Sequence, residues 1–364
     1  MTATPTTVFI NGRFLTQSIS GVQRYAQEIV GALDALAGEG ALVQRYMLLT
    51  PPGARVLDLR HIETRTVGTR NGHLWDQLDF ARAVRGGVAL GLAMTGPVAM
   101  KRQVVVIHDA SVQRHPEHYS RPYVLAHRII DRLLARRAVV ATVSEFSRRE
   151  LADVLPVAAR DIVVAPNGAE HLSIAPDAGV VERLGLTKNG YFLTLGNLTR
   201  NKNLAVVLRA LARLQPGSAK LVAVGRMERT VFGSAGLPEP GADVLLPGRL
   251  DDAEVAGLMQ GARALIFPSI YEGFGIPPLE AFVNECPVLA STAPAVQEVC
   301  GDAADYFEPH DDATLARLMQ MLLDDHDGAL RRDRLAKGKQ RVARYTWRGS
   351  AQILADACAK VAAR

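Results

Sequence analysis

The sequence has little cysteine, with Cys286, Cys300 and Cys358 as the only three among 364 residues. Their spacing matches no metal-binding motif, and an odd number argues against a framework of disulfides. We therefore predict three free, buried thiols in a protein of a reducing compartment.

The sequence also lacks a long hydrophobic run. None reaches the roughly 18 uncharged apolar residues that a membrane-spanning helix needs. The longest candidate, 86–100, is broken by four glycines and Pro97, so it predicts a strand and a loop. Residues 1–7 show no signal-peptide pattern, so we expect a cytoplasmic protein. The net charge of +5 is small for 42 basic and 37 acidic residues, and no nucleic-acid-binding motif accompanies it, so we expect no nucleic-acid partner.

Short apolar runs rich in β-branched residues alternate with amphipathic stretches, which is typical of parallel βαβ units. In the first half we predict strands over 7–10, 46–50, 103–107, 138–143 and 162–165, and helices over 22–37, 122–137 and 145–155. In the second half we predict strands over 191–195, 220–224, 244–246, 264–268, 287–290 and 305–307, and helices over 204–214, 252–261, 278–284 and 313–323.

The polar segment 170–189 separates the two series and is the expected linker. The sequence thus predicts an α/β protein with two doubly wound domains, about 1–175 and 185–345. A ligand is expected in the cleft at the carboxyl ends of their strands.

Three strand-to-helix loops have the composition of phosphate-binding loops, near Gly21, over 196–202 and within 264–282. Gly21 opens a helix after the first strand, which an ordinary βα turn explains about as well. After the strand 191–195 come Gly196, Asn197, Arg200 and Lys202, whose two cations are either ligands of a pyrophosphate or solvated loop charges.

The most informative segment is 264–282, ALIFPSIYEGFGIPPLEAF. A predicted strand ends at Pro268, a glycine-rich loop follows, and prolines open the next helix, where proline is well tolerated. The loop presents backbone N–H groups and a helix N-terminus, which favour an anion. Glu272 and Glu280 flank it. Because carboxylates repel phosphate, we expect them to bind hydroxyl groups of a sugar or ribose.

The motif EGFGIPPLEA, with glutamates eight positions apart, closely resembles the donor-site motif of family 4 retaining glycosyltransferases of the GT-B fold. The resemblance extends along nearly the whole chain: His108-Asp109 at a strand end, the turn around Ser144, Pro166-Asn167-Gly168, the loop 196–202, the loop 246–250 and the late motif 296–304. The ordered set is far more specific than any one motif. Asn197 departs from the family pattern, because relatives often carry arginine at this position. Arg200 is then the candidate for the second cation beside Lys202.

The resemblance implies two Rossmann-like domains and a last helix, 347–364, that returns to the first domain. It implies transfer of a hexose from a nucleotide sugar without a metal ion or other cofactor. Lys202, Arg200 and the loop residues Gly273, Phe274, Gly275 and Ile276 are then expected at the diphosphate. Glu280 is expected at the ribose, Glu272 and His108 at the donor sugar, and Asp109 as support for His108. The other expected donor-binding residues are Gly21, Gly196, Asn197, Arg249 and Leu250.

Mannosyltransferase-like features at Gly21–Tyr25 and His108-Asp109 favour GDP-mannose as donor, with UDP-sugars as the alternative. The expected acceptor is a glycan or lipid-linked sugar of a bacterial surface polysaccharide. A sugar-nucleotide 2-epimerase and a catalytically silent binding protein are the rival interpretations. The triplet Asp325-His326-Asp327 resembles a metal motif but follows a helix rather than a buried strand, so we predict a solvated helix end.

The predicted helix 121–137 carries Arg121, Arg128, Arg132 and Arg136 on one face and Val124, Leu125, Ile129, Leu133 and Leu134 on another. Such a helix either packs on a core or lies on an anionic membrane surface. Peripheral contact with the inner membrane is therefore one expectation.

Overall fold

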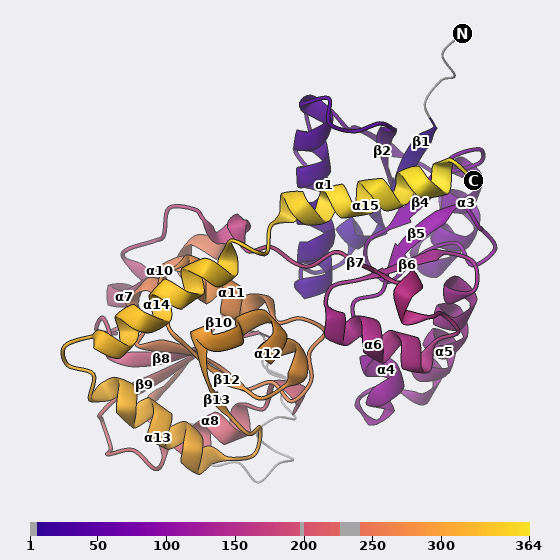
Figure 1. Ribbon diagram of the computed structural model, residues 1–364. Helices are drawn as coiled ribbons and strands as arrows, with labels where there is room; N and C mark the ends of the chain where they lie inside the picture. The colour runs from indigo at the N-terminus through magenta and orange to yellow at the C-terminus, as the bar shows by residue number, and fades with distance from the viewer. Residues whose placement is uncertain (1–5, 197–199, 226–240) are drawn as a thin grey trace. The chain divides into compact units, whose positions relative to one another are not determined.

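The computed structural model describes residues 6–196, 200–225 and 241–364, except for the side chain of Arg200. The chain forms two compact units: an N-terminal unit of Met1–Asn167 with Thr346–Arg364, and a C-terminal unit of Gly168–Tyr345. Each unit contains one parallel sheet flanked by helices (Figure 1). The predicted α/β fold with two Rossmann-like domains is confirmed.

The N-terminal sheet has the strand order β3-β2-β1-β4-β5-β6-β7 in the described residues. Its strands are β1 (Thr7–Asn11), β2 (Arg45–Thr50), β3 (Glu63–Thr66), β4 (Val88–Gly91), β5 (Gln103–Val106), β6 (Val139–Thr142) and β7 (Val163–Val164). Strand order reverses between β1 and β4, which makes the carboxyl ends of these two strands the switch point of the unit. Strand β3 was not predicted, because this edge strand is polar and exposed throughout.

The N-terminal unit has the helices α1 (Gly21–Gly38), α2 (Gly72–Leu74), α3 (Ala81–Ala83), α4 (Ser111–Arg114), α5 (Arg121–Ala135), α6 (Glu145–Val154) and α15 (Trp347–Ala362). A π-helical turn, Trp75–Phe80, joins α2 to α3. Helix α15 packs on α1. Its Ser350 hydroxyl donates to the Pro166 carbonyl at 2.5 Å, and its Arg348 forms a bidentate ion pair with Glu39 at 2.7 Å. The last helix is thereby part of the first unit.

The C-terminal sheet has the order β10-β9-β8-β11-β12-β13 in the described residues, so its switch point lies between β8 and β11. The strands are β8 (Tyr191–Leu195), β9 (Lys220–Val224), β10 (Val244–Gly248), β11 (Ala264–Phe267), β12 (Val288–Ser291) and β13 (Ala304–Phe307). The helices are α7 (Val180–Arg183), α8 (Leu204–Leu211), α10 (Asp252–Gly261), α11 (Ile276–Val283), α12 (Pro294–Cys300), α13 (Asp312–Leu323) and α14 (Ala329–Val342).

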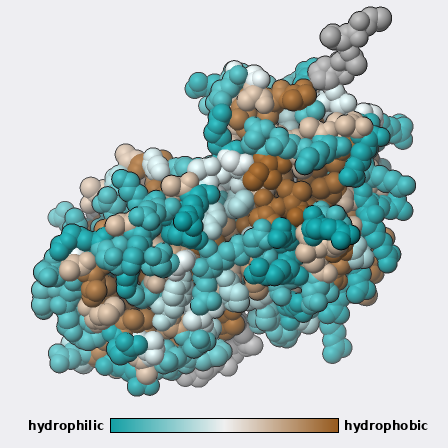
Figure 2. Space-filling view, in the orientation of Figure 1, coloured by the Kyte–Doolittle hydropathy of each residue, from teal (hydrophilic) through white to brown (hydrophobic). Residues whose placement is uncertain are grey.

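Apolar strand residues and amphipathic helices build the cores of both units. In the C-terminal unit, β8, β9, β11 and β12 contribute fully buried residues to a core that α8 and α13 cover. In the face seen in Figure 2, hydrophilic residues predominate, and a hydrophobic area lies beside α15. Cys286, Cys300 and Cys358 are buried free thiols, as predicted. Among the described residues, no helix is long and apolar enough to cross a membrane.

The acidic pairs Asp251-Asp252 and Asp311-Asp312 stand at the starts of α10 and α13, and the first residue of each pair caps its helix. Asp251 accepts a hydrogen bond from the Glu254 amide at 2.9 Å, and the Glu254 carboxylate accepts one from the Asp251 amide at 3.0 Å. Asp311 likewise accepts from the Thr314 amide at 2.9 Å. Such caps satisfy N–H groups that the first helical turn leaves unpaired, so these carboxylates have a structural role.

Candidate functional site

Two loops meet at the switch point of the C-terminal unit, one after β8 and one after β11. The Ile270 amide donates to the Asn201 carbonyl at 2.9 Å, and the Asn203 amide group donates to the Pro268 carbonyl at 3.3 Å. These bonds bring Lys202 against Glu272, and the two side chains form an ion pair. The switch point therefore holds a cation and a carboxylate on neighbouring loops.

The setting of this pair keeps Lys202 available to a ligand. Its ammonium group lies 5.4 Å from the centre of the Phe267 ring, and its side chain is 24% exposed against 16% for Glu272. A cation over an aromatic face is held by the ring quadrupole without being neutralised. A bound anion can then compete with Glu272 for the ammonium group.

The glycine-rich loop after β11 leads directly into α11. Gly275 precedes the helix with φ of 101°, a left-handed conformation that side-chain-bearing residues rarely adopt. Phe274 is buried and packs edge-on against Tyr345, with ring centres 5.4 Å apart. Because Pro277 and Pro278 have no N–H, the donors at this helix start come from the loop residues ahead of them. The loop thus leads into a helix N-terminus, a position that favours an anion.

Glu280 lies on α11 and is paired with a residue that the sequence analysis missed. The ring Nε2 of His171 lies 2.9 Å from Glu280 Oε1, and the two side chains are only 4% and 14% exposed. His171 sits in a short turn, Glu170–Leu172, three residues after the predicted Asn-Gly motif. That position next to a motif is the only signal that the sequence offers for it.

The N-terminal unit places His108 at the carboxyl end of its sheet, just after β5. Its Nε2 lies 2.9 Å from the Leu92 carbonyl, which follows β4, and the residue is 6% exposed. Since a carbonyl only accepts, Nε2 carries the proton and Nδ1 of the neutral ring is an acceptor. Burial lowers the pKa of His108, against smaller opposing effects of Leu92 and Asp109, so the neutral form predominates at neutral pH.

Aromatic packing fixes the His108 ring. Tyr25 of α1 meets it edge-on with ring centres 4.8 Å apart, and Trp347 of α15 meets Tyr25 at 5.8 Å. The Tyr25 hydroxyl donates to the Ala165 carbonyl at 3.0 Å. Asp109 accepts a hydrogen bond from the Ser111 amide at 2.8 Å, which stabilises the loop that follows His108.

Residues 182–341 match the family model described as Glycosyl transferases group 1. The sequence is 28% identical over 268 residues to O-antigen chain mannosyltransferase B of Escherichia coli. The alignment covers 69% of this chain and 68% of that protein. It is 28% identical over 204 residues to the serotype-specific mannosyltransferase WbdA of Escherichia coli, covering 54% of this chain but 24% of the relative. This chain is a glycosyltransferase with a group 1 domain.

Solved structures show the same fold along nearly the whole glycosyltransferase. Sucrose-phosphate synthase from Thermosynechococcus elongatus has a TM-score of 0.73 at 17% identity, covering 96% of this chain and 98% of that one. HepE from Anabaena, in complex with UDP and glucose, has a TM-score of 0.71 at 18% identity, covering 98% and 100%. At these identities the likeness concerns the fold, which is of the GT-B type.

The remaining predicted site residues of the glycosyltransferase are placed as follows. Gly196 follows β8 with φ of 122°, so it needs the freedom of glycine. Gly21 is the exposed first residue of α1, Arg249 is exposed, and Leu250 is half-buried. Asn197 lies outside the described residues, as does the side chain of Arg200. The structure brings together Lys202, Glu272 and the glycine-rich loop in one unit.

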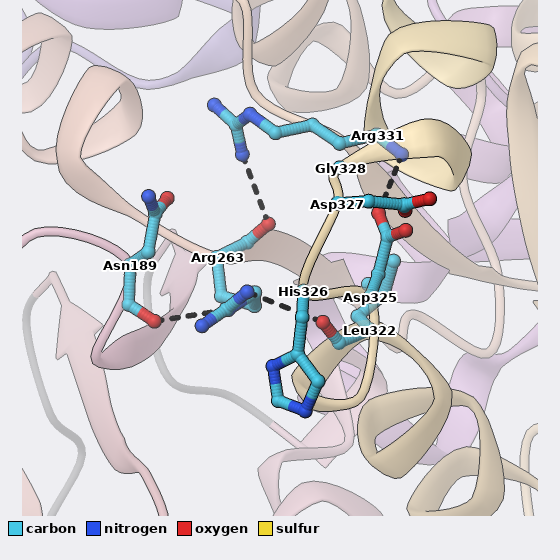
Figure 3. Close-up of a pocket in the computed structure, with 8 residues that line it drawn as sticks. All are labelled: Asn189, Arg263, Leu322, Asp325, His326, Asp327, Gly328 and Arg331. Carbon is cyan, nitrogen blue, oxygen red and sulfur yellow. Dashed lines mark hydrogen bonds between the residues drawn. The ribbon is translucent and has the colours of Figure 1, made fainter.

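A hollow of the glycosyltransferase lies at the amino-terminal edge of the C-terminal sheet, opposite the switch point (Figure 3). Here Arg263 donates to the carbonyls of Asn189 and Leu322 at 2.9 and 3.2 Å, and Arg331 donates to the Arg263 carbonyl at 3.3 Å. Asp325 of the acidic triplet accepts from the Arg331 amide at 3.0 Å. The charged groups of this hollow thus satisfy backbone groups, a structural role.

No group of three or more histidine, cysteine or acidic side chains suited to hold a metal ion occurs in the part of the chain that the structure describes.

Proposed function

We propose that this glycosyltransferase moves a hexose from a nucleoside-diphosphate sugar to a glycan or lipid-linked acceptor, with retention of the anomeric configuration. The observation that carries the proposal is the Lys202–Glu272 pair at the C-terminal switch point, beside the loop that opens α11. A cation and loop N–H groups suit a leaving diphosphate, and a neighbouring carboxylate suits sugar hydroxyls.

In this proposal Lys202 leaves Glu272 when the donor arrives and pairs with the diphosphate, where it stabilises the charge that develops as the glycosidic bond breaks. Glu272 then accepts hydrogen bonds from donor-sugar hydroxyls. Glu280 accepts from ribose hydroxyls, and His171 holds its carboxylate in place at 2.9 Å. Neutral His108 accepts a hydrogen bond from the donor sugar at Nδ1. In this proposal no metal ion takes part, because Lys202 and the N–H groups of the glycine-rich loop offset the charge of the diphosphate.

We infer that the donor is GDP-mannose and the pathway bacterial surface polysaccharide synthesis, because one relative is described as an O-antigen chain mannosyltransferase. The relatives favour transfer over sugar-nucleotide 2-epimerisation. A UDP-sugar is the second candidate, because HepE of similar fold is described in complex with UDP and glucose.

A thermal-shift screen tests the proposal with GDP, UDP, ADP, CMP and their sugar conjugates in the presence of a metal chelator. A nucleotide at a hundredfold excess over its Kd stabilises the protein by about 2.7 kcal/mol, a readily measured shift. We expect the shift with GDP compounds, and acceptor assays then use GDP-mannose. A shift with UDP compounds alone reassigns the donor, and no shift with any nucleotide rejects the proposed site.

Helix α5 supports the further proposal of peripheral contact with an anionic membrane. The sequence analysis placed Leu125 and Ile129 on one helix face with Val124 and Leu134. In the structure Leu125 and Ile129 are 62% and 51% exposed, whereas Val124 and Leu134 are buried. Exposed apolar side chains beside arginines suit a helix that lies in a membrane interface. Flotation with vesicles containing phosphatidylglycerol tests this. Binding is expected to fall when the four arginines are replaced, and unchanged binding contradicts the proposal.

A further inference from the structure

The glycine-rich loop that opens α11 depends on packing to keep its shape. Glycine has the widest choice of backbone conformations, so Gly273 and Gly275 lose more conformational entropy on ordering than other residues would. Phe274 lies between these two glycines and is only 4% exposed. Its buried ring is therefore the large side chain that can fix this short segment.

The loop packs against β11, α12 and one further ring of the C-terminal unit. A Cβ atom added at Gly275 would lie 3.2 Å from the Phe267 ring of β11 and 3.6 Å from Val296 of α12. The Phe274 ring meets Tyr345 edge-on, with ring centres 5.4 Å apart and ring planes at 86°. Aromatic pairs favour this arrangement, which has a defined geometry. Tyr345 thus packs on the side chain that fixes the loop.

Arg341 holds the Tyr345 ring in place. Its guanidinium carbon lies 5.6 Å from the centre of that ring, and its Nη2 donates to the Tyr345 hydroxyl at 3.2 Å. The hydroxyl in turn donates to the Glu298 carbonyl at 3.3 Å. Arg341 also donates to the carbonyls of Val299, at 2.8 Å, and Glu298, in the last turn of α12. Because a cation is favoured at the last carbonyls of a helix, Arg341 ties Tyr345 firmly to α12.

Helix α14 anchors both residues to α11. Arg341 lies in the last turn of α14, and the Tyr345 amide donates to the Val342 carbonyl at 3.0 Å just beyond the helix. Helix α14 packs on α11, where a Cβ atom at Gly338 would lie only 2.6 Å from the Phe282 ring (Figure 1). Glycine at this position permits the close approach of the two helices. Tyr345 is therefore held beside the helix that the loop opens, although it is the last residue of the unit.

We propose that Tyr345 is a positioning residue of the nucleotide site, which acts through Phe274 to hold the glycine-rich loop in the conformation that binds the diphosphate. This inference rests on the proposed function, in which N–H groups of residues 273–276 bind the diphosphate. Tyr345 acts without touching the donor, because a loop that is already ordered loses less conformational entropy when a ligand binds. Without the Tyr345 ring, the loop samples other conformations, and the ligand has to order it.

Limited proteolysis with chymotrypsin tests this support of the loop without any ligand. Chymotrypsin cleaves after accessible aromatic residues, so an opened loop becomes a substrate at the bond after Phe274. The cleavage rate then follows the population of the open loop. Tyr345→Leu is expected to raise the cleavage rate at this bond about tenfold, with the fragments identified by mass. Tyr345→Phe keeps the ring and is expected to be cleaved as slowly as the wild type.

Phe307→Leu is the matched control for a general loss of stability. Phe307 is a ring of β13 that is 1% exposed and belongs to the core that α8 and α13 cover, a cluster that does not include Phe274. Its replacement is expected to lower the stability of the same unit and to leave the cleavage rate after Phe274 unchanged. Equal acceleration in Phe307→Leu and Tyr345→Leu, or no acceleration in Tyr345→Leu, overturns the proposal.

Calorimetric titration with GDP, UDP, ADP and CMP gives a second readout. The Kd of the nucleotide that binds the wild type is expected to rise about tenfold in Tyr345→Leu, which corresponds to about 1.4 kcal/mol. The same Kd is expected to stay unchanged in Tyr345→Phe and in Phe307→Leu. Rescue by the conservative variant is a result that a merely destabilised protein does not give. An unchanged Kd in Tyr345→Leu overturns the proposal.

The two measurements distinguish this inference from the proposed function. Cleavage after Phe274 that depends on Tyr345, in a protein that binds no nucleotide, rejects the proposed function but keeps Tyr345 as the support of the loop. Nucleotide binding with the same Kd and the same cleavage rate in Tyr345→Leu keeps the proposed function and rejects the positioning role.

Discussion

The two halves of the molecule place an ion pair at the same point of their folds but in different surroundings. In the C-terminal unit, Lys202 and Glu272 are 24% and 16% exposed and lie between glycine-containing loops. In the N-terminal unit, Arg13 and Asp76 are 9% and 1% exposed and lie beside the rings of α5. In the proposed function the Lys202–Glu272 pair separates to admit an anion, whereas the more deeply buried Arg13–Asp76 pair stays closed as a support. The same topology therefore places one ion pair in a half-exposed setting and the other in a buried one.

Breaking the buried pair is expected to have the largest effect on stability. Asp76→Ala leaves the Arg13 guanidinium buried without its partner, and loss of one member of a buried pair costs about 3–5 kcal/mol. Burial raises the pKa of Asp76 against the opposing Arg13 charge and Asn11 bond, so the carboxylate already bears a desolvation cost. Urea denaturation measures the change.

Glu272→Ala is the matched variant in the other unit. Its ion pair is more exposed, so we expect a loss of about 1 kcal/mol or less in the free energy of unfolding, together with a loss of transfer activity. Equal destabilisation by the two variants would remove the distinction between a fixed and a separable pair.

Lys202 is the residue of the more exposed pair that the proposal places at the diphosphate, so its replacement tests the catalytic role of that pair. Lys202→Ala is expected to lower kcat for sugar transfer by a factor of about 10²–10³, the usual effect of removing one group that stabilises developing negative charge. The free energy of unfolding changes little. Lys188→Ala, an exposed lysine in the same unit, is the control and keeps full activity. If both variants transfer sugar at the same rate, Lys202 does not contact the diphosphate.

The sequence predicted those parts of the molecule whose signal is local. The bounds of β8 and β9 were predicted without error, because each is a short, largely apolar segment between polar turns. The loop from Glu272 to α11 was predicted for the same reason, since strand end, glycines and prolines follow one another in the chain.

The remainder depends on contacts between distant residues. The polar edge strand β3 owes its place to pairing with β2, which no pattern within its own four residues predicts. His171 and Glu280 are 109 residues apart. In α5 the buried face contains His127 and Asp131, whereas the analysis by hydrophobicity placed Leu125 and Ile129 on the apolar face. Hydrophobic periodicity thus fails where a helix buries polar groups.

The pH dependence of stability tests the burial of Asp131 in the N-terminal unit. Burial raises the pKa of Asp131 to about 6, above its ordinary value of about 3.9 in an unfolded chain. The folded protein then binds the proton more tightly, so this group lowers stability as pH rises from about 4 to 6, by up to about 3 kcal/mol. Asp131→Asn removes the effect and is expected to be more stable than the wild type above pH 6.

The measurement is thermal unfolding of both proteins across this pH range, taken as the difference between them so that other groups cancel. The amide side chain introduced by Asp131→Asn keeps an oxygen for Gln113 and places an N–H toward His127 Nδ1, so it suits the site. A difference that stays constant with pH shows that Asp131 has the same pKa in the folded and unfolded states.

The smallest expected effect concerns the support of His108. In the N-terminal unit the Tyr25 ring meets the His108 ring edge-on, so we expect a substitution at Tyr25 that keeps the ring to be tolerated. Tyr25→Phe removes only the hydrogen bond to the Ala165 carbonyl, and we expect a loss of about 1 kcal/mol in the free energy of unfolding with kcat unchanged. Tyr25→Leu removes the ring edge, releases the imidazole and lowers kcat more than it lowers stability. Equal kcat in both variants, measured at saturating donor and acceptor, shows that Tyr25 does not position His108. The hydrogen bond from His108 to Leu92 alone then orients the imidazole.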